Sequence, residues 1–146
     1  MITFISENID FQLDNEKEVS LWLQRVAAEY GKKIGRLNYV FCSDEKILNV
    51  NNQYLNHDYF TDIITFDYSA QNIISGDIYI SIDTVKSNTE KYNTLFINEL
   101  HRVIVHGLLH LTGQNDQAET EQTEMTGKEN EALGMLNGMT KQLLRM

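Results

Sequence analysis

The order of apolar and polar positions along the 146-residue chain predicts four strands and five helices. Segments rich in alternating or β-branched apolar residues are typical of strands, and they fall at residues 2–6, 37–42, 62–68 and 77–82. Segments with apolar residues three and four positions apart are typical of helices, and they fall at residues 15–30, 43–54, 83–92, 94–111 and 119–136. The last of these helices is acidic, and we expect most of it to be exposed.

The residues at the predicted helix ends support these boundaries. Asp14 or Asn15 is placed to cap the first helix, and Gly31 follows its last turn. Ser43 precedes the second helix, but Lys46 stands where a complete capping box has Glu, so we expect a partial cap there.

The order of the predicted elements, β-α-β-α-β-β-α-α-α, indicates the α+β class. We expect one small mixed β-sheet of about four strands covered by helices, with a metal-binding helix near residues 94–112. The order of the strands within the sheet stays open. The chain contains no proline, repeat or low-complexity linker, so we expect a single domain spanning residues 1–146.

The strongest candidate for chemistry lies at the end of the predicted helix 94–111. His106 and His110 are four residues apart, a spacing that places both imidazoles on one face of a helix. Gly113 allows the helix to end and the chain to turn back, so that Asp116 can supply a third ligand. Two histidines and one carboxylate suit zinc and leave a fourth position open, as catalytic zinc sites do.

Other interpretations of this run stay open. His106 and His110 can instead be core histidines followed by an ordinary turn. The helical zinc motif of peptidases has Glu directly after the first His, where this chain has Gly107. Metal-assisted hydrolysis is compatible with the run, whereas peptide hydrolysis would need a general base from elsewhere in the chain.

The run from His106 to Asp116 resembles the signature of the YbeY family of rRNA-maturation endoribonucleases, H-G-x-L-H-L-x-G-x-x-H. Residues 52–66 and 76–81 resemble two further blocks of that family, and the three blocks lie in the family's order. Two positions differ from the family. Asp116 stands where the family usually has His, and Leu55 stands where it often has Arg.

The resemblance implies a single-strand-specific, zinc-dependent endoribonuclease with one Zn²⁺ per chain, held by His106, His110 and Asp116. Its implied tasks are the 3′-end maturation of the small-subunit 16S rRNA and ribosome quality control. The implied partners are rRNA and ribosomal particles or ribosome-associated proteins. No membrane and no small-molecule organic cofactor is implied.

The segment before the predicted strand 62–68 holds the candidates for the substrate cleft. The resemblance places Tyr54, Asp58 and Thr61 in the cleft wall, although Asp58 and Thr61 are also common turn residues. No general base is identifiable from the sequence, and His57 and Asp58 are the candidates that position allows. The replacement of the family's Arg by Leu55 leaves the catalytic details open.

Three further residues have competing interpretations. Asp77 either belongs to a turn that starts a strand or is a carboxylate that orients a ligand histidine. His101 lies five residues before His106, which rotates it off the ligand face, so we expect a structural or exposed residue. Cys42 lies in an apolar run and cannot form an internal disulfide, so we expect a core thiol in a reducing, cytoplasmic setting.

The formal net charge of −9 argues against general nucleic-acid binding, which usually needs a basic surface. A local basic stretch is the exception, and its members are candidates for RNA contact: Arg25, Lys32, Lys33 and Arg36. The alternative for this stretch is a solvated loop between a helix and a strand.

Two other classes of function remain beside the endoribonuclease. One is a zinc metallopeptidase-like hydrolase, and the other is a non-catalytic, ribosome-associated module with structural zinc. The N-terminal residues show no basic segment followed by a long apolar stretch, so we expect neither a signal peptide nor a membrane anchor.

Overall fold

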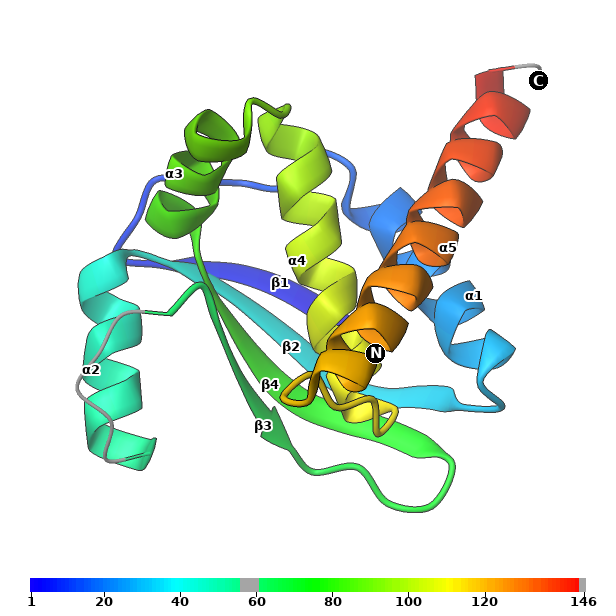
Figure 1. Cartoon of the computed structure of the whole chain (residues 1–146), viewed down its shortest axis with the longest axis horizontal. Helices are drawn as coiled ribbons and strands as arrows, with labels where there is room; N and C mark the ends of the chain where they lie inside the picture. Colours follow the sequence, from blue (N-terminus) through cyan, green and yellow to red (C-terminus); the bar gives the residue numbers. More distant parts are fainter. Residues whose placement is uncertain (56–60, 145–146) are drawn as a thin grey trace.

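Four strands form one mixed sheet in the order β1-β2-β4-β3 in the computed structural model, which describes residues 1–55 and 61–144 (Figure 1). Strands β1, β2 and β4 are parallel to one another, and β3 is antiparallel to β4 at one edge. The strands are β1 (Ile2–Glu7), β2 (Lys33–Cys42), β3 (Ile63–Asp67) and β4 (Ile73–Ser81). The predicted α+β class with a four-stranded mixed sheet is therefore confirmed.

Helices cover the two faces of this sheet unequally. The described part of the chain has five of them: α1 (Glu16–Glu29), α2 (Asp44–Leu55), α3 (Ile82–Tyr92), α4 (Phe96–Leu111) and α5 (Glu119–Leu144). Helices α1, α3, α4 and α5 contribute to one large apolar core, whereas α2 packs against the opposite face of the sheet. In Figure 1, α4 lies across the sheet between α3 and α5.

Two buried side chains of the large core form hydrogen bonds to other elements. The Trp22 indole of α1 donates to the carbonyl of Ala132 in α5 at 2.7 Å, and the Tyr39 hydroxyl of β2 donates to the carbonyl of Ile104 in α4 at 2.8 Å. Such bonds avoid the free-energy cost of burying an unpaired polar group. They hold α5 against α1 and α4 against the sheet, which matters because α4 and α5 carry the candidate site.

The smaller core lies under α2. It contains Cys42, Ile47, Val50 and Ile64. Burial raises the pKa of the Cys42 thiol to about 12, so this cysteine behaves as a core residue rather than as a nucleophile. Across residues 1–55 and 61–144, none of the helices combines the length and the apolar character that crossing a bilayer requires.

Several element boundaries differ from the predictions. Strands β2 and β4 each begin four residues earlier than predicted, because Lys33 and Ile34 pair with Ile73 and Ile74 before a shift in register. Pairing between distant segments therefore extends strands where the apolar pattern is weak. Asn15 is at the N-cap of α1, but its side chain makes no capping bond, whereas the Ser43 hydroxyl accepts from the backbone N–H of Lys46.

Helix α5 is the second difference. It continues to Leu144, eight residues beyond the predicted end at 136. Most of it is exposed, as expected, but five residues spaced four and three positions apart are buried: Met125, Glu129, Ala132, Leu136 and Met139. This stripe faces the large core and includes one carboxylate.

Candidate metal centre

Helix α4 places His106 and His110 on one face, one turn apart. Their Nε2 atoms are 3.0 Å apart, and both residues are half-buried. Gly107, between them, lies against the sheet. A Cβ atom there would stand 3.0 Å from side-chain atoms of Ile63 and Ile78, so glycine lets the helix approach the sheet closely.

The chain after α4 returns a carboxylate to the two histidines. Helix α4 ends at Leu111, and Gly113 adopts a φ of +105°, which reverses the chain direction. The Oδ2 atom of Asp116 then lies 3.3 Å from Nε2 of His106 and 3.3 Å from Nε2 of His110. Gln114 is buried in this loop and donates to the carbonyl of Asn115 at 2.8 Å, which helps to hold the turn.

The hydrogen bonds of the Nδ1 atoms decide which nitrogens face Asp116. His106 Nδ1 lies 2.6 Å from Oε2 of Glu129, and His110 Nδ1 lies 3.0 Å from the carbonyl oxygen of Gln114. Both partners are acceptors, so Nδ1 is the protonated nitrogen on each ring. The two Nε2 lone pairs are therefore available and point toward Oδ2 of Asp116.

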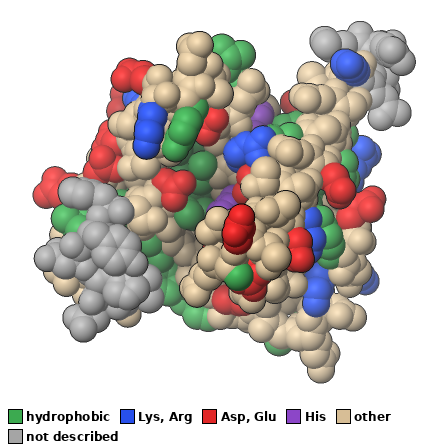
Figure 2. Space-filling model, in the orientation of Figure 1, with side chains coloured by type: hydrophobic (Ala, Val, Ile, Leu, Met, Phe, Trp, Pro, Cys, Tyr) green, Lys and Arg blue, Asp and Glu red, His purple; other side chains and the backbone are tan. Residues whose placement is uncertain are grey.

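These three atoms fit a metal ion. His106, His110 and Asp116 form a group that could hold an ion, with one ligand atom from each residue. A tetrahedral ion with bonds of ~2.0–2.1 Å separates its ligands by ~3.3–3.4 Å, close to the 3.0 and 3.3 Å found here. Figure 2 shows histidine atoms reaching the surface on this face of the molecule, with acidic and basic side chains beside them. Three protein ligands would leave one position open to water or substrate.

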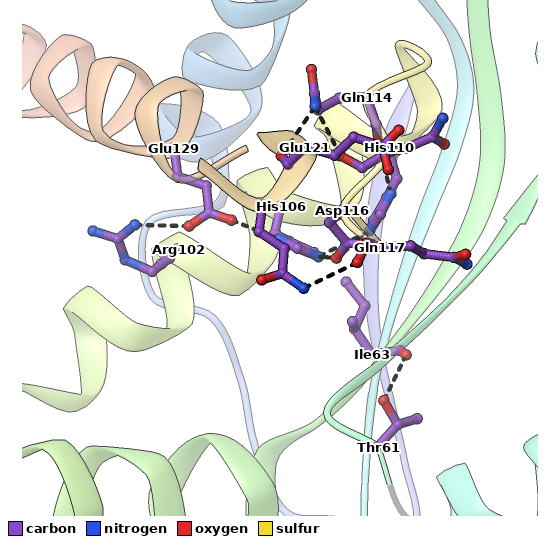
Figure 3. A network of polar contacts seen from close by, with 12 residues as sticks. Thr61, Ile63, Arg102, His106, His110, Gln114, Asp116, Gln117, Glu121 and Glu129 are labelled. Carbon is purple, nitrogen blue, oxygen red and sulfur yellow. Dashed lines mark hydrogen bonds and ion pairs between the residues drawn. The ribbon is translucent and has the colours of Figure 1, made fainter. Parts of the chain in front are cut away.

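Glu129 links this group to α5 (Figure 3). Glu129 is only 7% exposed, and each carboxylate oxygen has a partner. Oε2 accepts from His106, and Oε1 accepts from Nη1 of Arg102 at 2.8 Å. Burial raises the pKa of Glu129, but the bonds and charges of His106 and Arg102 outweigh burial and place the pKa below its ordinary value. Glu129 is therefore ionised at neutral pH.

The electrostatics of His106 follow from the same contacts. Burial lowers its pKa, but the hydrogen bond and charge of Glu129, with the charges of Asp116 and Asp62, outweigh burial and raise the pKa above its ordinary value. For Asp62 itself, burial is the largest influence, and the net effect is a raised pKa despite the opposing charge of His106. The site thus combines histidines and carboxylates in a partly desolvated setting, an arrangement common where catalysis occurs.

The predicted cleft residues lie in two places. The Thr61 hydroxyl donates to the carbonyl of Ile63 at the start of β3, and in Figure 3 Ile63 lies between Thr61 and the three-residue group. Tyr54 lies in the last turn of α2 and contacts Phe66 on the other face of the sheet. The candidate bases His57 and Asp58 lie outside the described residues, and so does the side chain of Leu55.

The structure also shows where Asp77 and His101 lie. Asp77 was expected in a turn or beside a ligand histidine, but it lies within β4 and accepts from Asn38 at 2.9 Å. The carboxylate that contacts a ligand histidine is Glu129 instead. His101 is buried against Trp22, with ring centroids 5.8 Å apart, away from the two other histidines of α4.

The basic stretch lies at the far end of the sheet from Asp62. Lys32 donates to the backbone of Gln71 in the β3–β4 turn, and Arg25, Lys33 and Arg36 are exposed. Contact between RNA and these residues stays a prediction.

Glu129, Arg102 and Asp62 were not among the residues predicted from the sequence. A signal for Glu129 existed, because it occupies a position in the spacing of four and three residues that Met125, Ala132 and Leu136 define. An acid within a buried stripe needs a partner, and is rarely there by chance. Asp62 has no comparable pattern, since its place beside His106 depends on the packing of α4.

Two histidines and one carboxylate converge on one point, and three ligands would leave a fourth coordination position open. This arrangement defines a candidate metal-dependent hydrolase. Comparison with known proteins agrees with this class. Residues 1–137 match the family described as Endoribonuclease YbeY. The chain belongs to this family of enzymes, hydrolases that cleave RNA phosphodiester bonds.

Individual relatives cover almost the whole chain. A protein named Endoribonuclease YbeY from Parabacteroides distasonis is 53% identical over 135 residues, which are 92% of this chain and 95% of the relative. A protein of the same name from Porphyromonas gingivalis is 43% identical, over 92% of this chain and 89% of its own. The solution structure of TM1509 from Thermotoga maritima, 24% identical, shares the fold with a TM-score of 0.69 and covers 97% of this chain and 93% of that chain.

Proposed function

We propose that this protein is a single-strand-specific, zinc-dependent endoribonuclease that acts in the 3′-end maturation of 16S rRNA and in ribosome quality control. The observation that carries the proposal is the convergence of two imidazole lone pairs and one carboxylate on a single point, in a chain of the endoribonuclease family. A cytoplasmic location follows from this task, with rRNA, ribosomal particles or ribosome-associated proteins as partners.

In this proposal His106, His110 and Asp116 hold one Zn²⁺. When bound, zinc supplies a Lewis acid for a phosphoryl oxygen and makes water a competent nucleophile near neutral pH. The protein's own contribution is to orient the ligands. Glu129 and the carbonyl of Gln114 hold the Nδ1 protons, so both Nε2 atoms face the ion.

We propose that Tyr54, Asp58 and Thr61 form the wall of the substrate cleft. Thr61 precedes the start of β3 and donates to Ile63, whereas Tyr54 is on the far side of β3. With Asp58, these residues would guide the RNA strand past the site. His57 and Asp58 remain candidates for a general base, and a 2′-hydroxyl of the RNA could serve as the nucleophile instead.

The negative net charge of this protein repels the phosphates of RNA. With a net charge of −9 we expect weak binding to free RNA, and the local basic stretch is the candidate for what attraction exists. Replacing Lys32, Lys33 and Arg36 together with Gln should weaken binding to RNA or ribosomal particles and flatten its salt dependence. Zinc content should not change. Unchanged RNA binding across a salt series would show that this stretch is an ordinary solvated loop without a role in RNA contact.

The peptidase alternative has less support. A helical zinc peptidase needs Glu directly after its first His, but Gly107 faces Ile63 and Ile78 in the core. A Glu there could not reach water at the metal. Hydrolysis of casein without cleavage of RNA would nevertheless favour the peptidase. Bound zinc without any hydrolysis, together with binding to ribosomal particles, would favour a non-catalytic module.

One experiment tests the proposal directly. Metal analysis of the purified protein should find about one zinc-class ion per chain, and single-stranded RNA should be cleaved without chelator but not with it. His110→Ala should lose both metal and cleavage. His101→Ala is the matched control, because it removes a histidine of the same helix that does not face the site. Metal-independent cleavage, or equal losses in the two variants, would contradict the proposal.

A further inference from the structure

The face of the sheet opposite α4 carries a row of aligned side chains. The strand register places Thr3, Asn38, Asp77 and Phe66 beside one another across all four strands. Side chains two residues apart share a face, so Tyr79 lies on this face, next to Asp77. Helix α2 covers one end of this face, where it packs on Ile64, and leaves the row at Asp77 more open.

An aromatic hollow of about 190 Å³ lies at this open end, and Tyr54, Phe66, Tyr68, Asp77 and Tyr79 line it. The Phe66 ring meets Tyr54 and Tyr79 edge-on, with centroids 5.9 and 6.0 Å apart. Tyr54 is 63% exposed and Tyr68 is 64% exposed. Rings this exposed contribute little to a core, so they offer free faces for stacking.

Asp77 is held in a fixed orientation at the base of the hollow. The Thr3 hydroxyl donates to Oδ1 of Asn38, which turns the amide nitrogen of Asn38 toward Asp77. That nitrogen donates to Oδ1 of Asp77 at 2.9 Å. An ionised carboxylate only accepts hydrogen bonds, so the hollow presents a positioned acceptor beside several aromatic rings.

We propose that this hollow binds one unstacked base of single-stranded RNA and prefers guanine. Aromatic side chains stack on bases of any type, which supplies affinity. The Asp77 carboxylate repels phosphate and accepts from base N–H groups, which supplies preference. Guanine offers two adjacent donors on its Watson–Crick edge, N1–H and the N2 amino group, and they match the two oxygens of a carboxylate.

The hollow and the metal centre lie on opposite faces of the same edge strand. In β3, Ile63 contacts Gly107 on the side of α4, whereas Phe66 lines the hollow on the other side. A single strand that crosses β3 would reach both places, with the anchored base a few nucleotides from the site of cleavage. This inference rests on the proposed ribonuclease function, since it names part of the substrate.

The test is the binding of fluorescent 2′-O-methyl oligouridylates, with or without one internal guanosine, to the zinc-loaded protein by anisotropy, with gels to verify that the strands stay intact. One guanosine should tighten binding by about fivefold or more. Asp77→Asn should remove this preference, because its amide keeps the Asn38 bond through oxygen and turns an N–H₂ group toward the base. Tyr68→Leu should weaken binding to both strands by about fivefold.

A matched control separates this effect from a general loss of aromatic surface. Tyr92, at the end of α3, is 59% exposed and lies outside the hollow, so Tyr92→Leu should bind like the parent. A guanosine preference that survives Asp77→Asn, or equal binding by the Tyr68 and Tyr92 variants, would overturn the proposal. So would loss of binding to ribosomal particles with unchanged oligonucleotide binding, because the occupant would then be a protein.

The experiments give different results if the proposed base-binding hollow is wrong than if the proposed ribonuclease function is wrong. If the parent cleaves RNA in a metal-dependent way while the variants bind every strand like the parent, the hollow is wrong and the function stands. If the parent shows the guanosine preference and cleaves no RNA, the ribonuclease function is wrong and the hollow stands.

Discussion

Replacing Glu129 with Gln should weaken metal binding without removing any metal ligand. The change keeps the size of the side chain and removes its charge. In the parent, one carboxylate oxygen accepts from His106 at 2.6 Å and the other accepts from Arg102 at 2.8 Å. The neutral amide can still contact either group, but it no longer stabilises positive charge that moves onto the His106 ring when Nε2 binds a cation.

The size of the effect follows from this arrangement. Carboxylates that hold a ligand histidine typically change metal affinity by ~10–100-fold, which corresponds to ~1.4–2.8 kcal/mol. Glu129 is 7% exposed and its bond to His106 is short, so solvent screens it weakly. We therefore expect a loss of about 30-fold or more in zinc affinity.

Competition with a chromophoric zinc chelator measures this affinity. Glu131→Gln is the matched control, because Glu131 is an exposed acid on the same helix. Thermal unfolding of the metal-free proteins shows whether both variants remain folded. The reasoning is refuted if folded Glu129→Gln and Glu131→Gln bind zinc with the same affinity, since Glu129 would then serve only to pair with Arg102.

Three further predictions concern Asp116, Gly107 and His101. Asp116→Ala should lose most metal binding and RNA cleavage, whereas Asp116→His should retain more because imidazole is also a zinc ligand; equal losses in metal titrations would contradict the ligand role. Gly107→Glu should lower the free energy of unfolding by about 3 kcal/mol or more, because an unpaired carboxylate would face Ile63 and Ile78; denaturant titration measures this, and an unchanged midpoint would contradict the packing. Burial lowers the pKa of His101 below its ordinary 6.5, while the charge of a neighbouring acid in α1 opposes this. The unfolded chain therefore binds more protons below about pH 6.5, and stability should fall as pH drops through that value. His101→Phe should reduce this fall in pH-dependent melting, and an unchanged pH profile would show that other groups cause it.

The fold could be predicted from the sequence as far as local patterns reach. The apolar spacing of Val19, Trp22 and Val26 predicts α1 because helix periodicity is local. The first residues of β2 and β4 could not be predicted, since Lys33 becomes part of a strand only by pairing with Ile73. The strand order β1-β2-β4-β3 likewise depends on contacts between distant segments.

In the candidate site, too, local contacts could be predicted from the sequence and contacts between distant segments could not. His106 and His110 are one turn apart on the same helix, and Asp116 follows a short turn. The proximity of all three could therefore be predicted from the sequence. Glu129 and Asp62 come from other elements, and their approach to His106 depends on how α5 and β3 pack against α4. Contacts of this kind leave little trace in a single sequence.

The position of Asp116 between two helices has a consequence for the C-terminal part of the chain. An ion held by His106 and Asp116 would act as a clip between the end of α4 and the segment that leads into α5. Ligand binding to the folded state alone stabilises it by ~2.7 kcal/mol when free ligand is at 100 times its dissociation constant. Amides of α5 should then exchange with solvent faster after chelation, while those of the central strands β2 and β4 change least. If the bound ion is zinc, a shortage of zinc would expose the long terminal helix to proteases before the central strands.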